Sequence, residues 1–446
     1  MDLPLADLRR VCRDLAWSDI AAMPGLTNRL GPRVAAPSDS VATESPPIDW
    51  SADGMALDSL ARMQLATAAA SWCNAYDAGF EDLFLAKRNT ADWAVVMQRA
   101  RAAGAAHFTF ATSGSTGARK HIRHREDVLA AEAAAWAQVF ASPPSAAEPP
   151  NPANPSQLAY PVIRRVVVLA PTHHIYGFIW GVLVPLLWGV PAVDADLAAL
   201  PALLPGDLIV AVPDQWAWLA NAPRLFNPGG VQGVSSTAPL PDAVHSALIT
   251  PAAVHATDHA ANGPAPLARL LQIYGSTETG GLAFRAAPGL PYTLAPGRSR
   301  NASGGIDLQL PDGSLAAMAV QDELRWADSG GVDGVDGARA GHFQLLRRSD
   351  HSVQVGGHNV SPAWVEAQWL AQSGVAAVSV RLSSTAQPPR LKAFVVLHAP
   401  EPAGQRAQLE AWAAEHLPWY AAPQHITYGA QLPVNAMGKP ADWPEA

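Results

Sequence analysis

The chain has 446 residues, 49% of them hydrophobic and 15% charged, so it is long enough for two or three folded domains and is not a disordered protein. Its formal net charge of −8 at pH 7 argues against a nucleic-acid-binding surface. Cys12 and Cys73 are the only cysteines, which excludes a disulfide or zinc-ribbon scaffold and fits a reducing cytoplasm. The N-terminus has no basic stretch followed by an apolar one, so we expect a cytoplasmic protein without a secretory signal.

Residues 1–103 are predicted to form a mainly helical segment. The first helix would have an apolar face made of Leu5, Leu8, Val11, Cys12 and Leu15. A proline- and serine-rich loop follows over 22–48, and further helices are expected over 58–75 and 91–102. The triplet Asp58-Ser59-Leu60 resembles the site at which acyl carrier proteins receive phosphopantetheine. The alternative is that Asp58 and Ser59 cap the second helix, and both interpretations stay open at this point.

Residues 104–348 are predicted to form an α/β core. Apolar strands are expected at 165–170, 207–212 and 268–274, and the stretches between them suit a doubly wound, mostly parallel sheet. Residues 166–193 contain no Asp, Glu, Lys or Arg and are long enough to span a bilayer. The prolines and histidines within them favour a strand, a polar turn and a core helix instead, so no membrane contact is expected. Short strands between Gly and Asp turns over 290–346 predict a small β subdomain.

Residues 349–446 are predicted to form a smaller α+β domain. The expected elements are a helix over 362–372, strands over 376–382 and 391–397, a helix over 404–416 and a short strand near 425.

Residues 108–120 read Phe-Thr-Phe-Ala-Thr-Ser-Gly-Ser-Thr-Gly-Ala-Arg-Lys, a short strand followed by hydroxyls and glycines. Such a loop can turn at its glycines and point N–H groups and hydroxyls at a polyphosphate, while Lys120 adds a point charge. The order Gly-x4-Gly-Lys-Ser/Thr of a Walker loop is absent. The segment therefore predicts a phosphate-binding loop, with a plain Ser/Gly-rich surface loop as the alternative.

Further polar motifs follow this loop, several of them at the ends of predicted strands. In chain order they are Pro171-Thr-His-His-Ile-Tyr-Gly177, Ser235-Ser-Thr-Ala-Pro-Leu-Pro241, Ile273-Tyr-Gly-Ser-Thr-Glu-Thr-Gly280, Trp326-Ala-Asp328, Leu346-Arg-Arg-Ser-Asp-His351, Val355-Gly-Gly-His-Asn-Val-Ser-Pro362 and Leu432-Pro-Val-Asn-Ala-Met-Gly-Lys439.

With these motifs in this order, residues 105–445 resemble the adenylate-forming superfamily of acyl- and aryl-CoA synthetases, peptide adenylation domains and luciferases. The resemblance implies a large α/β N-terminal region and a small mobile α+β C-terminal domain. It also implies two half-reactions at one site. A carboxylate first attacks the α-phosphate of ATP and releases pyrophosphate, and a thiol then takes the acyl group from the adenylate and releases AMP. Because both partners in the first step are anionic, positioning and charge neutralisation must carry that step.

The resemblance implies a nucleotide site spread over several segments. The residues implied for ATP or AMP are Thr112, Ser113, Gly114, Ser115, Thr116, Gly117, Lys120, Ser236, Thr237, Ala238, Tyr274, Gly275, Ser276, Asp328 and Arg348. Residues 112–117 and Lys120 would hold the β- and γ-phosphates. Tyr274 and the turn at 236–238 would flank adenine, and Asp328 would accept the ribose hydroxyls.

The residues implied for catalysis are Lys439, Thr277, Glu278 and His174. Glu278 would hold Mg²⁺ together with ATP oxygens, a ligand set that this hard cation favours, and Thr277 would contact the α-phosphate. Lys439 would reach the substrate carboxylate and the α-phosphate together; the alternative is a solvated lysine near the chain terminus. Asp350 matches the family's hinge position. Gly356 and Gly357 would face the thiol in the second step.

The acid pocket is expected near His174, Tyr176, Phe178, Ser235, Gly280 and Gly281, an aromatic and compact set that favours a hydroxybenzoate-like aryl acid. The chain looks similar to aryl-acid ligases of aryl polyene pigment pathways, in which the acceptor is the phosphopantetheine thiol of an acyl carrier protein. Arg119, Arg347 and Gln354 depart from the family pattern, which bears on the acceptor more than on adenylation. The alternatives are an aryl- or short-acyl-CoA synthetase that uses free CoA and a non-catalytic nucleotide-binding protein.

Overall fold

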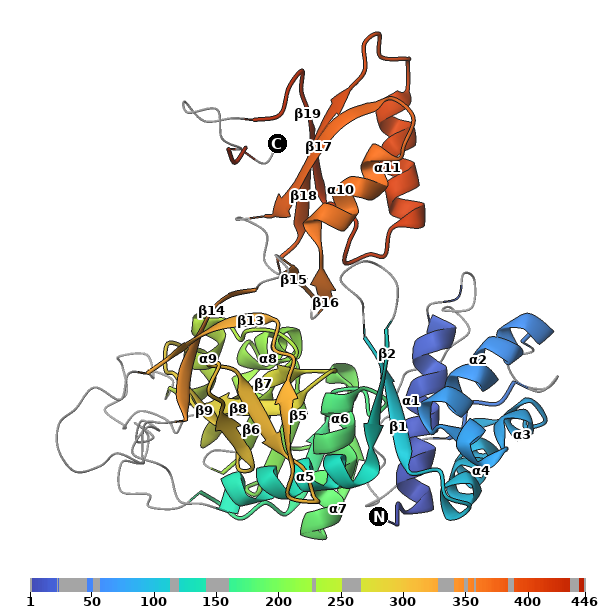
Figure 1. Cartoon of the computed structure of the whole chain (residues 1–446), viewed down its shortest axis with the longest axis vertical. Coiled ribbons are helices and arrows are strands. Elements are labelled where there is room, and N and C mark those ends of the chain that lie inside the picture. Colours follow the sequence, from blue (N-terminus) through green and yellow to red (C-terminus); the bar gives the residue numbers. More distant parts are fainter. Residues whose placement is uncertain are drawn as a thin grey trace. The chain divides into compact units, whose positions relative to one another are not determined.

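The structure, a computed structural model, describes residues 2–21, 23, 46–50, 57–112, 120–141, 160–226, 230–250, 266–327, 341–348, 352–356, 358–383, 389–433 and 441–444 (Figure 1). The chain divides into two compact units. The first contains residues 1–111, 121–320 and 324–344, and the second contains residues 112–120, 321–323 and 345–446.

A nine-stranded sheet forms the centre of the first unit, with strand order β13-β14-β9-β8-β7-β6-β5-β3-β4 (Figure 1). Strands β4, β3, β5, β6 and β7 run parallel, and β8, β9 and β14 continue the sheet in antiparallel pairs. Their bounds are Arg165–Val168 (β3), Ala192–Asp194 (β4), Asp207–Ala211 (β5), Gln232–Ser235 (β6), Arg269–Ser276 (β7), Gly280–Arg285 (β8), Tyr292–Leu294 (β9), Asp322–Trp326 (β13) and His342–Arg348 (β14). The strands predicted at 165–170, 207–212 and 268–274 are confirmed as β3, β5 and β7.

Both faces of the parallel strands are covered. On β3, Val166 and Val168 lie in one core with Trp136 of α5, whereas Val167 lies in a second core with Trp216 of α8. The helices of the first face are α5 (Glu126–Ala141), α6 (Ile175–Phe178), the π-helical turn η3 (Ile179–Leu183) and α7 (Val184–Trp188); those of the second are α8 (Pro213–Ala220) and α9 (Asp242–Ile249). Strands buried on both faces need apolar side chains at successive positions, which explains the continuous apolar runs. The predicted doubly wound α/β fold is confirmed.

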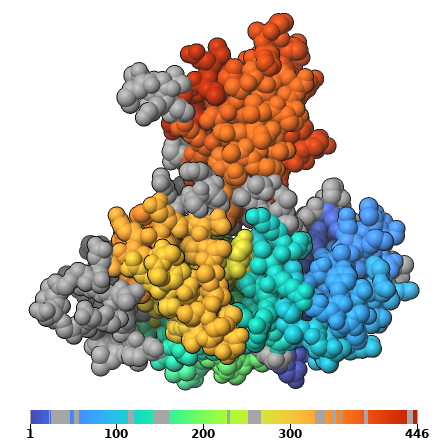
Figure 2. All heavy atoms as spheres, viewed as in Figure 1, coloured from blue at the N-terminus to red at the C-terminus, as the bar shows by residue number. Residues whose placement is uncertain are grey.

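The N-terminal helices are α1 (Leu5–Ala21), α2 (Ser59–Trp72), the short turn η2 (Ala75–Ala78), α3 (Glu81–Leu85) and α4 (Thr90–Ala102). They share the first of the two cores: the Trp72 ring centroid lies 5.0 Å from that of Phe108 in β1 (His107–Ala111) and 5.3 Å from that of Phe178 in α6. Figure 2 shows the blue surface of these helices directly against the teal hairpin that β1 forms with β2 (His121–Arg125). Asp58 caps α2, because its Oδ1 accepts a hydrogen bond from the Ala61 N–H at 2.8 Å.

Charged side chains fix α1 to the central sheet. The Arg10 guanidinium donates to the Asp194 carboxylate at the end of β4 and, at 2.9 Å, to the Gly181 carbonyl. Buried Asp14 accepts hydrogen bonds from the backbone N–H and the hydroxyl of Thr172, at 2.7 and 2.8 Å. Helix α1 therefore holds the polar turn that leads to His174.

The segment over 166–193 folds as predicted, into β3, a polar turn and the α6–η3–α7 helical run. Within the described residues, no helix has the length and apolar character needed to cross a membrane.

The described residues of 290–346 form short strands, as predicted, but only some of these strands make a separate sheet. Strands β10 (Arg298–Arg300), β11 (Ile306–Gln309) and β12 (Leu315–Met318) pair with one another, whereas β9, β13 and β14 extend the central sheet. The reason lies in aromatic packing. Tyr292 of β9 and Phe343 of β14 are buried and stacked at 5.9 Å, and both rings lie within 6 Å of Tyr274 on β7.

The second unit contains a three-stranded sheet with two helices. Its strands are β17 (Val375–Leu382), β18 (Leu391–Leu397) and β19 (His425–Tyr428), its helices are α10 (Pro362–Leu370) and α11 (Gln405–His416), and β15 (Val353–Val355) pairs with β16 (His358–Val360). The five elements predicted after residue 361 are confirmed. Most of their observed ends lie within two residues of the predicted ends. They enclose their own core, which includes Val365, Trp369, Leu391 and Leu409.

Candidate nucleotide and acid site

The predicted phosphate loop connects two paired strands. Strand β1 (His107–Ala111) runs antiparallel to β2 (His121–Arg125), with Ala111 opposite His121. Beyond this pair, the Thr112 N–H donates to the Lys120 carbonyl at 2.8 Å. Residues 113–119, and with them Ser113 to Gly117 of the predicted site, lie outside the described residues. The structure therefore brings together Thr112 and Lys120, the two ends of the motif.

The predicted motif over residues 273–280 forms a tight hairpin between β7 and β8. The Thr279 hydroxyl accepts from the Ser276 N–H at 3.0 Å and donates to the Gly280 carbonyl at 2.8 Å, which closes the turn that presents Thr277 and Glu278. A Cβ on Gly275 would lie 2.1 Å from the Gly280 carbonyl oxygen, so the pairing at this point requires glycine. Glu278 is exposed.

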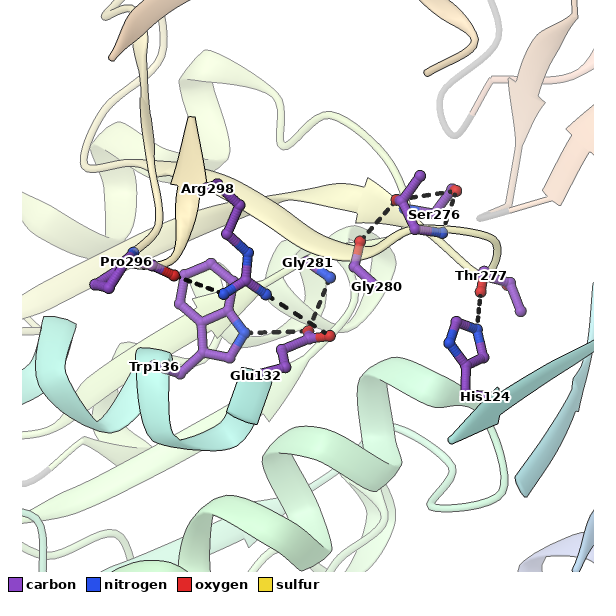
Figure 3. A network of polar contacts seen from close by, with 10 residues as sticks. His124, Glu132, Trp136, Ser276, Thr277, Gly280, Gly281, Pro296 and Arg298 are labelled. Carbon is purple, nitrogen blue, oxygen red and sulfur yellow. Dashed lines mark hydrogen bonds and ion pairs between the residues drawn. The ribbon is translucent and has the colours of Figure 1, made fainter. Parts of the chain in front are cut away.

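One histidine joins these two motifs. His124 of β2 contacts the Thr277 carbonyl through Nε2 at 2.7 Å (Figure 3). The strand that leaves the phosphate loop therefore touches the hairpin that carries the predicted α-phosphate and magnesium residues, across 153 positions of sequence. His124 was not among the predicted site residues.

A buried carboxylate lies beneath the hairpin. Glu132 Oε1 accepts from the Gly281 N–H at 2.8 Å and from the Trp136 indole N–H at 3.2 Å, and Oε2 lies 4.0 Å from the Arg298 guanidinium (Figure 3). The side chains of Glu132 and Arg298 are 8% and 3% exposed. Burial lowers the pKa of Arg298, although the Glu132 charge opposes that shift. The cluster connects α5, β8 and β10 directly behind the predicted acid-pocket residues Gly280 and Gly281.

Replacing Gly280 tests how closely Glu132 approaches the backbone. Gly280 has φ +65°, and an added Cβ would lie 2.1 Å from Glu132 Oε2. Gly289 has φ +77° with no atom within 4 Å of its added Cβ, so it is the matched control for backbone strain alone. We expect Gly289→Ala to lower the free energy of unfolding by about 1 kcal/mol and Gly280→Ala to lower it by roughly 1–3 kcal/mol more, as measured by chemical denaturation. If the two substitutions lower the free energy of unfolding equally, Glu132 moves away from the added methyl group without a cost in stability.

The predicted adenine turn follows β6 and carries backbone strain. The Ser236 hydroxyl donates to the Ile273 carbonyl of β7 at 3.1 Å, which holds the turn beside Tyr274. Thr237 has φ +79°, a conformation that costs a β-branched residue roughly 1–3 kcal/mol. Ala238 completes the turn. Strain of this kind concentrates at ligand sites, and here it falls on one of the predicted nucleotide residues.

The predicted acid-pocket residues have different environments. His174 is exposed at the N-terminus of α6, and its ring centroid lies 4.1 Å from that of His173. The Tyr176 hydroxyl is directed at carbonyls of the sheet, 2.8 Å from that of Val234 and 3.2 Å from that of Ala211, and burial raises the pKa of this phenol well above its ordinary value. Phe178 is fully buried in the aromatic cluster with Trp72, and Ser235 is buried at the end of β6.

The remaining predicted residues lie mostly outside the part of the chain that the structure describes. Asp328, Asp350, Gly357 and Lys439 are in this group, and Arg348 is described only as the last backbone residue of β14. Gly356 has φ +54°, and a Cβ there would lie 2.3 Å from the Trp419 ring, so this turn requires glycine.

Glu132 and Arg298 were missed by sequence analysis, although one signal was available. Glu132 lies between alanines, three residues after Leu129 and four before Trp136, and so falls on the apolar face of its helix. An acid at such a position has to find a buried partner.

Comparison with known proteins identifies the class to which this fold and site belong. A family model described as AMP-binding enzyme matches residues 59–312. The chain therefore belongs to the AMP-binding enzyme family of the adenylate-forming superfamily, and it is an AMP-forming acid–thiol ligase. The match begins at the first residue of α2, so helices α2 to α4 lie within the range that the family model matches.

Three curated relatives cover most of the chain, and each is named 4-coumarate–CoA ligase. The relative from Rhodobacter capsulatus is 36% identical over 410 residues, which cover 90% of this chain and 93% of the relative. That from Halorhodospira halophila is 34% identical over 394 residues, or 87% and 88% of the two chains. The relative from Cereibacter sphaeroides is 33% identical over 402 residues, or 88% and 84%.

Solved structures agree with the fold. A double mutant of o-succinylbenzoate CoA synthetase from Bacillus subtilis superposes with a TM-score of 0.51 and 17% identity, covering 75% of this chain and 67% of that one. The amide bond synthetase McbA from Marinactinospora thermotolerans gives a TM-score of 0.50 and 17% identity, covering 74% and 67%.

Proposed function

We propose that this ligase activates a hydroxylated aryl acid of the coumarate type and transfers it to CoA. The observation that carries the proposal is the agreement of the three relatives, which are 33–36% identical over 84–93% of their own lengths and share one name. This favours free CoA, the alternative acceptor, over the carrier-protein thiol of our first interpretation. It also extends the expected acid from a hydroxybenzoate to a longer phenylpropenoate.

The site residues support the adenylation half-reaction in the following way. Lys120 and the hydroxyls of the phosphate loop would hold the β- and γ-phosphates, and Thr277 would contact the α-phosphate. Tyr274 and the strained turn at 236–238 would flank adenine, with Asp328 on the ribose. The contact between His124 and Thr277 fixes the β7–β8 turn to β2, the strand that leaves the phosphate loop. It would therefore keep the residues that hold the β- and γ-phosphates at a fixed distance from the residue that contacts the α-phosphate.

Magnesium would be held by Glu278 and by oxygens of ATP. No group of three or more His, Cys, Asp or Glu side chains suited to a metal ion occurs among the described residues. A site made of one exposed carboxylate plus nucleotide oxygens fits a cation that keeps several waters and binds substrate phosphates. When bound, the ion would neutralise phosphate charge during attack by the acid.

The acid would lie along Gly280 and Gly281, near His174. An added Cβ on Gly281 would lie 2.6 Å from the Trp136 ring, so the backbone of β8 packs directly against an aromatic side chain here. A flat aryl acid suits a surface of this kind.

A two-part assay tests the proposal. We expect ATP–pyrophosphate exchange, measured over benzoates, hydroxycinnamates and C2–C12 aliphatic acids, to peak on 4-coumarate or a close analogue. With that acid, thioester formation should be faster with CoA than with a phosphopantetheinylated carrier protein. A maximum on aliphatic acids would contradict the aryl claim, faster loading of the carrier protein would restore the carrier interpretation, and no exchange with any acid would leave a non-catalytic nucleotide-binding protein.

A further inference from the structure

A buried carboxylate on helix α1 holds the turn that precedes His174. Asp14 is 2% exposed, and its Oδ2 accepts from the Thr172 N–H at 2.7 Å and from the Thr172 hydroxyl at 2.8 Å. Burying a carboxylate is costly unless its oxygens accept hydrogen bonds, and here one residue of the turn supplies both of these donors. Thr172 is itself fully buried, so the contact is shielded from water.

A second helix holds the next residue of the same turn. The indole N–H of Trp72 on α2 donates to the His173 carbonyl at 3.0 Å, and both side chains are buried. The turn also closes on itself, because the His174 N–H donates to the Pro171 carbonyl at 3.2 Å. The two residues before His174 are therefore fixed from α1 and from α2.

Helix α6 connects this turn to the predicted acid pocket. An added Cβ on Gly177 would lie 2.0 Å from the Pro171 carbonyl oxygen, so the helix backbone packs directly against the turn. The same helix packs against β8, the strand that contains Gly280 and Gly281. The position of His174 relative to β8 therefore depends on the turn that α1 and α2 hold.

We propose that Asp14 is a positioning residue for use of the acid substrate, acting through Thr172 on His174. This inference rests on the proposed function, in which His174 lies near the bound acid. Without the carboxylate, the N–H and the hydroxyl of Thr172 lose their acceptor, and the turn can leave its position. A displacement of about 1 Å at a reacting site can cost on the order of 100-fold in rate. The described residues predicted for ATP lie on other turns, at the ends of β1, β6 and β7, so the effect should fall on the acid.

A double-mutant cycle with His174 tests this coupling. We expect Asp14→Ala to lower kcat/KM for 4-coumarate about tenfold, while KM for ATP stays within about twofold of wild type. In a His174→Ala background the same substitution should lower kcat/KM by less than about twofold, because the side chain that it displaces is already absent. Asp14→Asn keeps an acceptor oxygen for both Thr172 donors, so it should recover most of the activity.

Arg10→Met is the matched control. It removes the other charged contact of α1, which reaches Asp194 and the Gly181 carbonyl, but leaves the acceptor of the turn in place. Its kcat/KM for 4-coumarate should stay within about twofold of wild type, even where chemical denaturation shows a loss of stability as large as that of Asp14→Ala. If the two variants lower kcat/KM equally, loosening of α1 as a whole explains the effect and the inference is wrong.

Additive effects of Asp14→Ala and His174→Ala would also overturn the inference, as would an unchanged kcat/KM in Asp14→Ala. If Asp14→Ala fails to fold, Thr172→Val removes the hydroxyl donor, keeps the backbone N–H and is judged by the same cycle. Wild-type enzyme is measured beside all variants. A wild type that does not use 4-coumarate contradicts the proposed substrate, and the cycle is then run with the acid of fastest exchange, whereas an active wild type with additive variants refutes only the role of Asp14.

Discussion

Lys439→Ala is expected to lower ATP–pyrophosphate exchange by at least about 100-fold while ATP binding and thioester formation from supplied adenylate persist. The ammonium would neutralise charge where a carboxylate meets the α-phosphate. A charged hydrogen bond contributes roughly 1.5–3 kcal/mol, which corresponds to about 10- to 100-fold in rate, and a pre-organised site can give more. In the second half-reaction the thiol attacks the adenylate and AMP leaves. No free carboxylate approaches the α-phosphate in this step, so it should continue without the Lys439 ammonium.

Two other lysines of the chain, Lys87 and Lys120, provide the controls. Lys87→Ala removes a lysine outside all predicted motifs and should leave exchange unchanged. Lys120→Ala should weaken ATP binding as well as exchange, since Lys120 closes the phosphate loop. Unchanged exchange in Lys439→Ala would refute the assignment of this lysine, and a parallel loss of thioester formation would show that the substitution disturbs more than one step.

Much of the fold was predictable because its signals are local. Strand β18 was predicted with its exact bounds from one apolar run between turn residues, and helix α11 from apolar spacing. Membership in a sheet is not a local property. The turns over 290–346 predicted short strands, but only the buried contact of Tyr292 and Phe343 shows that β9 and β14 extend the central sheet.

The candidate site also has a part that local sequence signals predict and a part that they do not. Its motifs are contiguous in sequence and could be recognised one at a time, but the contacts that hold them together join distant residues. His124 meets Thr277 across 153 positions, and Glu132 meets Gly281 across 149. Neither pair has a sequence pattern of its own, because a buried carboxylate requires donors without fixing where in the chain they come from.

The Glu132 cluster supplies the second large expected effect. Glu132→Ala should lower the free energy of unfolding by about 3–5 kcal/mol, because it leaves the Gly281 and Trp136 N–H groups without their acceptor and the buried Arg298 guanidinium without a counter-charge. Arg298→Met should cost less, about 1–3 kcal/mol, because the Glu132 carboxylate that it leaves keeps its hydrogen bonds from the Gly281 and Trp136 N–H groups. Burial already lowers the pKa of Arg298 despite the Glu132 charge, which means that burial disfavours the cation by more than Glu132 favours it. Chemical denaturation of both variants measures this asymmetry, and a larger effect for Arg298→Met would contradict it.

Glu132→Gln separates the charge of this side chain from its hydrogen bonds. The amide oxygen can still accept from Gly281 and Trp136, so most of the stability should remain. The turn between β7 and β8 should then stay in place, and kcat/KM for the acid should fall less than about threefold. In Glu132→Ala the Gly281 N–H loses its acceptor, so Gly280 and Gly281 should shift, and kcat/KM should fall at least tenfold in protein that is still folded. If the two variants lose activity equally, the negative charge of Glu132 and not its hydrogen bonds sets the position of the pocket.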